Sequence, residues 1–521
     1  MTHVHDACQP DGCGCCLSRR GFVKGCGAAL ALAAGADRAP GEDKPAGKGV
    51  RVAVVFLSNS RGREMWPYPN FDCAPRHKAI LAALRKGCAN VAFVPVVAKS
   101  PADAKKAIAL KDTVDGYIVY CVTLSFGLRR VLDQVAALRK PTIVADEVLG
   151  GTAIFLIGHS LAARRKLPVV GVSSRRDADL VAAAGAFAEL AKPGATPAAF
   201  VKRCGELYRG TFPAADTTAP KADRPALTDI GRCVKRFRAS HILIVGRGKP
   251  GSVHNCLGAK ATCLGFGELK ALYDKADPTA AARWADRWTK QAKKVVEPKP
   301  DVIRHAGAMY LATLELMKRH KADTVTMNCL GGFASGKLPS YPCLGFMQLL
   351  DDGRQGVCEA MTDDSLSMLM ARILTGRPGY VSDPAIDTSK GEVIYAHCVA
   401  TTKVFGPEGA QNPYDVRSLH NRDPRGVCTQ SFLPEGYMTT SFRTNYGRKE
   451  LVIHQARSSG NVISDYGCRT KLRARVVGDI EKLMRHWDRF GWHRVTTYGD
   501  VKAPLIAFGK ALGLKTIVEE T

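Results

Sequence analysis

Two carboxylates stand where acid–base or metal chemistry is often placed in α/β proteins. Glu359 follows the short apolar segment 357–358, and Asp383 follows a second such segment, 380–382. Each segment predicts a strand, with one helix between them. In a right-handed β-α-β unit, the carboxyl ends of both strands lie at the same edge of the sheet, where ligands bind. The pair could therefore bind a divalent cation or transfer protons. The alternative is that both are ordinary strand-end acids that cap loops.

The segment between the two carboxylates predicts a single helix. Asp363 and Asp364 suit its N-terminus, where carboxylates cap free N–H groups and offset the helix dipole. Gly376 suits the position just after the last turn, and Pro378 prevents continuation. Apolar residues recur at helical spacing between these ends: Leu366, Leu369, Met370, Ile373 and Leu374.

This region resembles the L-fucose isomerase-like sugar isomerases, which are relatives of L-arabinose isomerase. The shared pattern is P-C-L-x-x-x-x-L-x-D-x-G, then C-E, an amphipathic helix ending in L-T-G-x-P, an Asp, and H-C. The resemblance implies two Rossmann-like domains followed by a β-rich domain. The matching residues are Pro342, Cys343, Leu344, Leu349, Asp351, Gly353, Cys358, Glu359, Leu374, Thr375, Gly376, Pro378, Asp383, His397 and Cys398.

The resemblance also implies a metal site. Glu359 and Asp383 would ligate Mn²⁺, and the segment 491–499 resembles the family's C-terminal part, which makes His493 the third ligand. Such a donor set also suits Fe²⁺ or Zn²⁺. Met361 stands where family members often carry an acidic residue, so the sugar can differ. Spacing alone leaves four other histidines as equal candidates: His397, His420, His454 and His486.

The implied activity is aldose–ketose isomerisation through an enediolate, stabilised by the cation, with Glu359 and Asp383 moving the proton. In the loop after the first strand, Arg61 could bind sugar hydroxyls and Trp66 could pack on a sugar face, or each could simply anchor the loop. We expect a homo-oligomer that acts on a small sugar. The alternative function is a non-catalytic or repurposed sugar-binding protein on the same scaffold.

The rest of the chain predicts an α/β fold with three parts after a leader. Apolar segments at 50–57, 91–97, 116–122 and 141–145 alternate with helical patterns, which indicates a parallel sheet covered by helices. This part spans 49–211 and ends at the Pro- and Ala-rich linker 212–227. A second Rossmann-like domain is expected over 228–376, with a strand at 241–245 and a helix at 302–319. A β-rich domain is expected over 377–521, closed by a helix near 479–489.

Residues 1–36 predict an export leader. Ser18-Arg19-Arg20-Gly21-Phe22-Val23-Lys24 resembles a twin-arginine signature at six of seven positions, with Val in place of Leu. Residues 25–36 are mildly apolar and end in an A-x-A cleavage site. We therefore expect recognition by the twin-arginine translocase and a periplasmic protein. If the leader is not used, the protein stays in the cytoplasm. Export motivates the sugar-binding alternative, since sugar isomerases usually work in the cytoplasm.

Three other motifs are weaker evidence for a function. Ser160, in Gly158-His159-Ser160-Leu161-Ala162 after an apolar run, is one residue short of a nucleophile elbow and would make a serine hydrolase. The glycine-rich segments 246–251 and 331–337 follow strands. The second lacks the hydroxyl residue of a phosphate loop, and no clear helix follows the first, so a turn is expected there.

Composition and charge limit the class of protein and the partners that are expected. The formal net charge is +27, but the basic residues are dispersed, so no nucleic-acid partner is expected. No apolar run reaches the length of a membrane span, so no integral membrane segment is expected after leader removal. Of 18 cysteines, five lie in the leader, where with two histidines they could bind a metal. The others form no C-x-x-C pair and are expected to be buried small hydrophobes.

Overall fold

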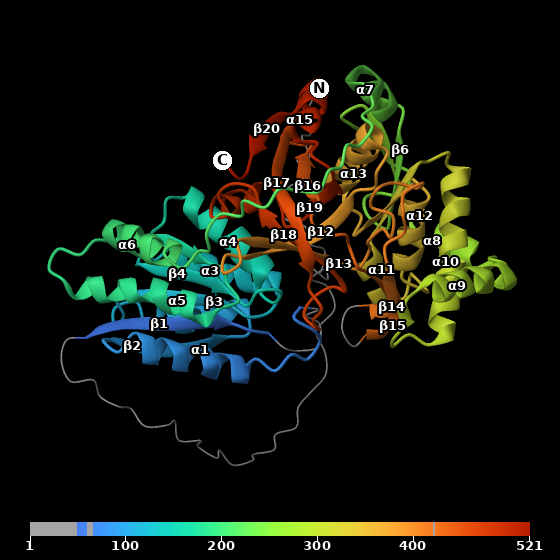
Figure 1. The fold of residues 1–521 in the computed structure, drawn as a ribbon. Helices are drawn as coiled ribbons and strands as arrows, with labels where there is room; N and C mark the ends of the chain where they lie inside the picture. The colour runs from blue at the N-terminus through green and yellow to red at the C-terminus, as the bar shows by residue number, and fades with distance from the viewer. Residues whose placement is uncertain (1–48, 60–65, 420–422) are drawn as a thin grey trace, which may run out of the picture.

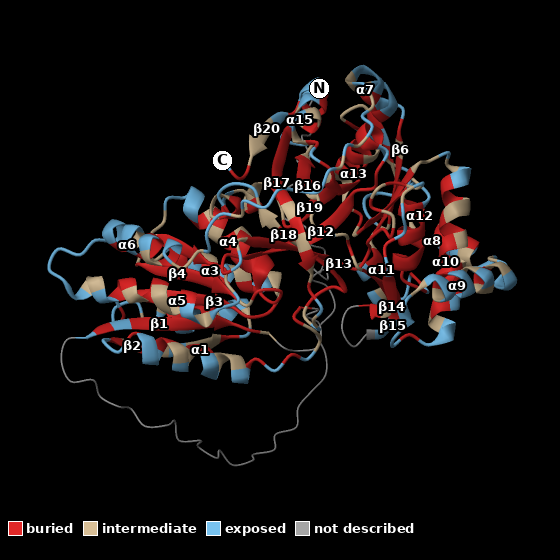
Figure 2. Ribbon diagram, in the orientation of Figure 1, coloured by how far each residue is buried: buried red, intermediate tan, exposed pale blue. Residues whose placement is uncertain are grey.

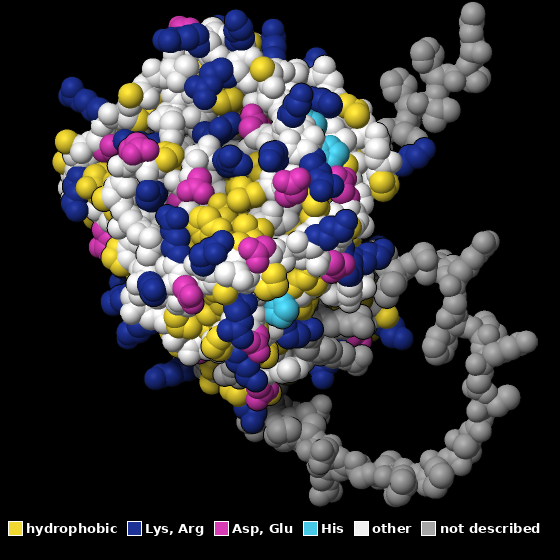
Figure 3. Space-filling model, turned by 90° about the vertical axis from the view of Figure 1, so that its right-hand side faces the viewer, with side chains coloured by type: hydrophobic (Ala, Val, Ile, Leu, Met, Phe, Trp, Pro, Cys, Tyr) yellow, Lys and Arg dark blue, Asp and Glu magenta, His cyan; other side chains and the backbone are white. Residues whose placement is uncertain are grey.

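The computed structural model describes residues 49–59, 66–419 and 423–521, and the protein is a mixed α/β molecule (Figure 1). The predicted export leader, Arg61 and His420 lie outside these residues. Within them, no helix is both long and apolar enough to cross a bilayer. Lys and Arg side chains are scattered over the face shown in Figure 3, interleaved with carboxylates and apolar areas.

The N-terminal unit is a parallel sheet with strand order β2-β1-β3-β4-β5. Its strands β3 and β4 are buried along their whole length because helices cover the sheet (Figure 2). This is the parallel sheet that the alternating pattern predicts. Its strands are β1 (Val50–Leu57), β2 (Val91–Ala98), β3 (Gly116–Cys121), β4 (Thr142–Asp146) and β5 (Val169–Val172). Its main helices are α1 (Ala74–Gly87), α2 (Ala104–Ile108), α3 (Arg129–Ala136), α4 (Thr152–Arg164), α5 (Asp177–Ala184) and α6 (Pro197–Arg209).

The middle of the chain forms a second sheet with strand order β11-β10-β6-β8-β7, in which only the β7–β8 pair is antiparallel within the described residues. Its strands are β6 (His241–Val245), β7 (Val253–Cys256), β8 (Ala259–Leu264), β10 (Thr324–Met327) and β11 (Gln355–Cys358). Its helices are α7 (Ile230–Arg238), α8 (Phe266–Asp274), α9 (Pro278–Gln291), α10 (Pro300–Arg319), α11 (Cys329–Ala334), α12 (Cys343–Asp351) and α13 (Thr362–Thr375).

The C-terminal part is rich in strands, as predicted. The order β16-β19-β12-β13-β18-β17-β20, with a further β16–β17 pairing, closes this sheet on itself. A smaller sheet joins β15 and β14 to β9 (Lys294–Val295) of the middle segment. The strands are β12 (Tyr380–Asp387), β13 (Glu392–His397), β14 (Tyr414–Leu419), β15 (Asp423–Ser431), β16 (Met438–Asn445), β17 (Glu450–Asn461), β18 (Thr470–Val476), β19 (Arg494–Tyr498) and β20 (Lys515–Val518).

The helix expected near 479–489 is instead a 3₁₀ turn, Lys482–Arg485, followed by the short α14 (Trp487–Phe490). A longer helix, α15 (Lys502–Ala511), packs near the C-terminus and was not predicted. Between β11 and β12, α13 ends as the sequence indicates. Gly376 adopts a left-handed conformation with φ +69°, and its N–H bonds to the Arg372 carbonyl.

The β-α-β interpretation of 357–383 is wrong. β11 is an edge strand of the middle sheet, whereas β12 lies in the closed sheet between the antiparallel strands β13 and β19. A strand–helix–strand pattern does not say which sheet each strand joins. Only a short turn separates β12 from β13, and strands connected this closely pair antiparallel. The site must therefore form between two sheets rather than at one edge.

Asp146, the last residue of β4, is buried, and its titration should make the stability of the fold depend on pH. Asp146 is 2% exposed, and Thr152 Oγ1 donates to its Oδ2 at 2.6 Å. Burial raises the pKa of Asp146 to about 7. The folded state thus holds this proton more tightly than the unfolded state, so stability falls as pH rises from the usual aspartate pKa toward 7. Asp146→Asn keeps the bond to Thr152 and removes the titration.

We expect the free energy of unfolding of Asp146→Asn, relative to the native sequence, to rise by about 2 kcal/mol between pH 5.5 and pH 8. Urea unfolding of both proteins at the two pH values measures this difference. Other buried carboxyls titrate in both proteins and cancel. A difference that stays constant with pH would show that Asp146 is already ionised at pH 5.5.

Candidate metal centre and active site

Glu359 lies in a strained turn directly after β11. Glu359 and Ala360 have φ values of +68° and +52°, which non-glycine residues rarely adopt. Each such residue costs on the order of 1–3 kcal/mol and persists only where its surroundings hold it. The Ala360 N–H bonds to the Met327 carbonyl, and the Met361 N–H donates to Thr326 Oγ1. The end of β10 thus holds Glu359 in place, with its side chain 29% exposed.

The closed sheet supplies Asp383 and His493 from adjacent strands. In the antiparallel β12–β19 pair, Ser382 lies opposite Arg494, which brings the next residues, Asp383 and His493, side by side. His493 Nε2 lies 3.1 Å from Asp383 Oδ1 and 3.6 Å from Glu359 Oε2. Asp383 and His493 are each only 7% exposed. The structure therefore brings the three predicted ligands together around one imidazole nitrogen.

A buried carboxylate holds the His493 ring from behind. Asp364, in the first turn of α13, accepts a 2.5 Å hydrogen bond from His493 Nδ1. Its other oxygen accepts from Arg443 Nε at 2.6 Å, and its side chain is fully buried. With Nδ1 occupied in this way, Nε2 faces the two other carboxylates. A carboxylate behind a histidine is the usual arrangement for orienting a metal ligand. In sequence, Asp364 looked like a helix-cap residue, and no spacing signal marks it otherwise.

Burial and charge set the protonation of this cluster. Burial, together with Asp383 and Asp364, raises the pKa of Glu359 to about 7. The positive charges of His493 and Arg247 act in the opposite direction but are outweighed. Burial lowers the pKa of His493, but Asp364 and Asp383 outweigh it and raise it well above the ordinary value. Burial also raises the pKa of Asp364, but Arg443 and His493 hold it far below its usual range. A cation bound here would compete with these protons.

The donor set fits a divalent cation. Asp383 Oδ1 is buried. No described group forms a hydrogen bond of good geometry with it, although His493 Nε2 lies 3.1 Å away. Two carboxylates and an imidazole are donors that Mn²⁺ accepts. His397, the last residue of β13, is a further candidate. One ligand atom each from Glu359, His397 and His493 lies within 4.8 Å of the others.

The other histidines left open by spacing lie elsewhere or outside the described residues. His454 pairs with Glu519 through Nδ1 at 2.8 Å and with Tyr395 through Nε2 at 2.6 Å. His486 is the residue preceding α14, and burial lowers its pKa. His420 is not described.

The first glycine-rich segment contributes to the site in a way that sequence reasoning missed. As expected, Gly246-Arg247-Gly248 forms a turn after β6, and a strand follows instead of a helix. Arg247 Nη1 donates to the Ala360 carbonyl at 3.4 Å and contacts Met361 Sδ at 3.2 Å. Arg247 thus places a positive charge beside the Glu359 turn, next to Met361.

Trp66 and Ser160 are both buried. The Trp66 ring is 1% exposed and packs edge-on against Trp492, with ring centroids 5.0 Å apart. This is the packing of an anchor for the segment that carries His493, and sugar contact by Trp66 stays a prediction, as does that by Arg61. The nucleophile-elbow interpretation of Ser160 is wrong, because Ser160 lies inside α4 rather than at a strand-to-helix turn. Its Oγ donates to the Ile157 carbonyl and accepts from the Asp488 N–H.

Comparisons with known proteins add no identification. No protein-family model matches the sequence, and no curated protein matches it significantly.

Proposed function

We propose that the protein is a divalent-metal-dependent aldose–ketose isomerase, with Mn²⁺ held by Glu359, Asp383 and His493. The observation that supports this most is the convergence of three side chains from two different sheets. The carboxylates of Glu359 and Asp383 both lie within 3.6 Å of His493 Nε2. The strand orders are compatible with two Rossmann-like domains ahead of a β-rich domain. We further propose that the leader directs twin-arginine export to the periplasm and that the enzyme is a homo-oligomer.

The chemistry required of the residues is modest. Isomerisation moves a proton between two adjacent sugar carbons while the carbonyl changes place. A bound Mn²⁺ supplies a Lewis acid that stabilises negative charge on the two sugar oxygens. Glu359 has a pKa of about 7 in the metal-free site, and a bound cation would favour its ionised form, which can accept a proton. Its partial exposure leaves it accessible to a sugar, whereas Asp383 and His493 are buried beneath it.

The remaining residues hold the geometry. Asp364 fixes the His493 ring and is itself held by Arg443, so the imidazole keeps one orientation during the reaction. Arg247 stabilises the carbonyl side of the strained turn that carries Glu359. Both contacts limit motion of the proposed ligands, which is what a reaction dependent on positioning needs.

The test is solvent exchange. The purified full-length protein is supplied with Mn²⁺ and a panel of aldoses in D₂O, and ketose formation is followed by NMR. We expect ketose that carries deuterium at C1, and recovered aldose that carries it at C2, because the moving proton resides on a carboxylate that exchanges with water. Metal-dependent sugar binding without deuterium incorporation would favour the sugar-binding alternative. Absence of both sugar binding and exchange over the whole panel would contradict the proposal.

A further inference from the structure

A group of buried thiols lies directly behind the carboxylate site. Cys358 immediately precedes Glu359, and Cys398 immediately follows His397. The Cys358 thiol contacts those of Cys398 and Cys329, and the Cys398 thiol also contacts that of Cys343. All four thiols are at most 7% exposed. All the described cysteines are free and buried, and this group brings together thiols that lie far apart in the sequence.

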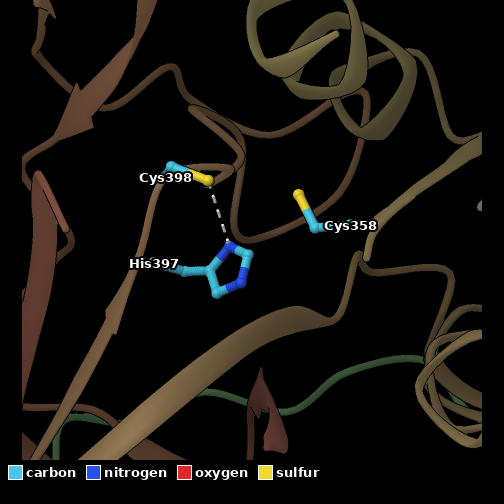
Figure 4. Close-up of side chains that lie close together, drawn as sticks. All are labelled: Cys358, His397 and Cys398. Carbon is cyan, nitrogen blue, oxygen red and sulfur yellow. Dashed lines mark hydrogen bonds between the residues drawn. The ribbon is translucent and has the colours of Figure 1, made fainter. Parts of the chain in front are cut away.

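Cys358, His397 and Cys398 lie close enough together to share one metal ion, and Cys343 lies beside Cys398. Cys398 Sγ lies 4.0 Å from Cys343 Sγ and 3.7 Å from His397 Nδ1. The ligand atoms of Cys358, His397 and Cys398 all lie within 4.8 Å of one another (Figure 4). With Zn–S bonds of about 2.3 Å and Zn–N bonds of about 2.0–2.1 Å, a tetrahedral ion separates two sulfurs by about 3.8 Å, and sulfur from nitrogen by about 3.6 Å. A disulfide would instead require an S–S distance near 2.05 Å.

Rigid elements hold these donors. Cys358 ends β11, His397 ends β13, and Cys343 begins α12, so none of the three depends on a long loop. In Figure 4 the sulfurs of Cys398 and Cys358 flank the His397 ring, and a dashed line joins Cys398 to the ring. The donors also differ in kind from the neighbouring site. Thiolates select soft or borderline cations such as zinc, whereas carboxylates suit Mn²⁺.

We propose that Cys343, Cys358, Cys398 and His397 bind one Zn²⁺ ion in a closed, structural site that adjoins the carboxylate site. Four protein ligands leave no open position, which is typical of structural rather than catalytic zinc. The ion links the end of β11 in the middle sheet to the end of β13 in the closed sheet. It thereby holds the strained Glu359 turn against the strands that carry Asp383. The proposal does not depend on isomerase activity.

Cobalt(II) is the probe for this site, because thiolate ligands give it an intense charge-transfer absorption that carboxylates do not. The full-length protein, reduced and freed of metal, is titrated anaerobically with Co²⁺. We expect one equivalent of thiolate-bound Co²⁺, displaced stoichiometrically by Zn²⁺. Cys358→Ser and Cys398→Ser should each weaken binding at least about 100-fold, more than loss of an outer-shell partner does.

Two matched variants serve as controls. Cys204→Ser removes a buried thiol in α6, and Glu359→Gln removes a carboxylate of the neighbouring site. Both should retain the thiolate absorption. Failure of the isomerase assay with an intact cobalt signal would overturn only the proposed function, and the reverse result would overturn only the zinc site.

X-ray absorption at the zinc edge of the native sequence loaded with one equivalent of Zn²⁺ does not depend on any variant folding. We expect about three sulfurs near 2.3 Å and one nitrogen near 2.0 Å. A shell of oxygen and nitrogen only, a cobalt signal that survives Cys398→Ser, or a Cys343–Cys398 disulfide in unreduced protein would each overturn the zinc site.

Discussion

We expect Glu359→Gln and Asp383→Asn each to lower turnover in the proposed aldose–ketose conversion by about 10²–10⁴-fold, the usual cost of losing a general base. Each change keeps the size of the side chain and removes one negative charge that faces His493 Nε2. Metal affinity should fall as well, since a neutral amide is a poorer ligand than a carboxylate. Initial rates at saturating Mn²⁺ and sugar, with metal affinity measured separately by calorimetry, distinguish the two effects.

His493→Ala should mainly weaken the metal, and added Mn²⁺ should restore part of the rate. Ser160→Ala is the matched control. Its hydroxyl only bonds within α4 and to Asp488, so its loss should cost about 1 kcal/mol of stability and leave isomerisation unchanged. If Glu359→Gln binds metal normally and isomerises at the native rate, the site assignment is wrong.

We expect Glu519→Gln to lower the free energy of unfolding by about 3–5 kcal/mol, because it leaves a buried arginine without its countercharge. Arg494 and Glu519 are both fully buried, and Arg494 donates to the two Glu519 oxygens at 2.6 and 3.1 Å. His454 Nδ1 lies 2.8 Å from the same carboxylate. Since Arg494 follows His493 in the chain, the variant should also reduce metal affinity.

The pKa of Glu519 gives the direction of its pH dependence. Burial alone raises this pKa, but Arg494 and His454 outweigh burial and lower it to about 2. The stabilisation is therefore present above the usual glutamate pKa and is lost as pH falls toward 2. Urea unfolding at pH 7 measures the effect of Glu519→Gln at its full size. Glu315→Gln breaks an exposed pair with Arg319 and should cost no more than about 0.5 kcal/mol. A loss below 1 kcal/mol for Glu519→Gln would contradict the prediction.

Local patterns predicted many elements well. The helix at 302–319 is α10, which begins with Pro300, and the first strand runs over Val50–Leu57 as expected. α13 begins near Asp363 and ends at Gly376. These signals depend on residues close together in the chain, such as a proline in the first turn or a glycine that accepts a left-handed conformation.

The same patterns failed where distant contacts decide the structure. A nucleophile elbow at Ser160 would need a strand before it. The apolar run there lies instead in α4, where it is buried on most of its helix surface, and periodicity cannot distinguish such a helix from a buried strand. Residues 253–291 form β7, β8, α8 and α9, none of which was predicted. Asp364 and Arg247 were not predicted to belong to the site, because the residues that they contact lie far away in the sequence.

For the site, the sequence by itself determined which residue types were present, and the family resemblance predicted that Glu359 and Asp383 lie near His493. Their proximity was expected for the wrong reason, since β11 and β12 do not share a sheet. Only the tertiary structure decided that the closed sheet sets Asp383 beside His493, and that Asp364 turns the His493 Nε2 toward Glu359. It also gathered Cys343, Cys358 and Cys398, which no spacing motif connects. The physical reason is that strand pairing and the packing of one sheet on another join residues across the whole chain, whereas spacing reports only on neighbours within one element.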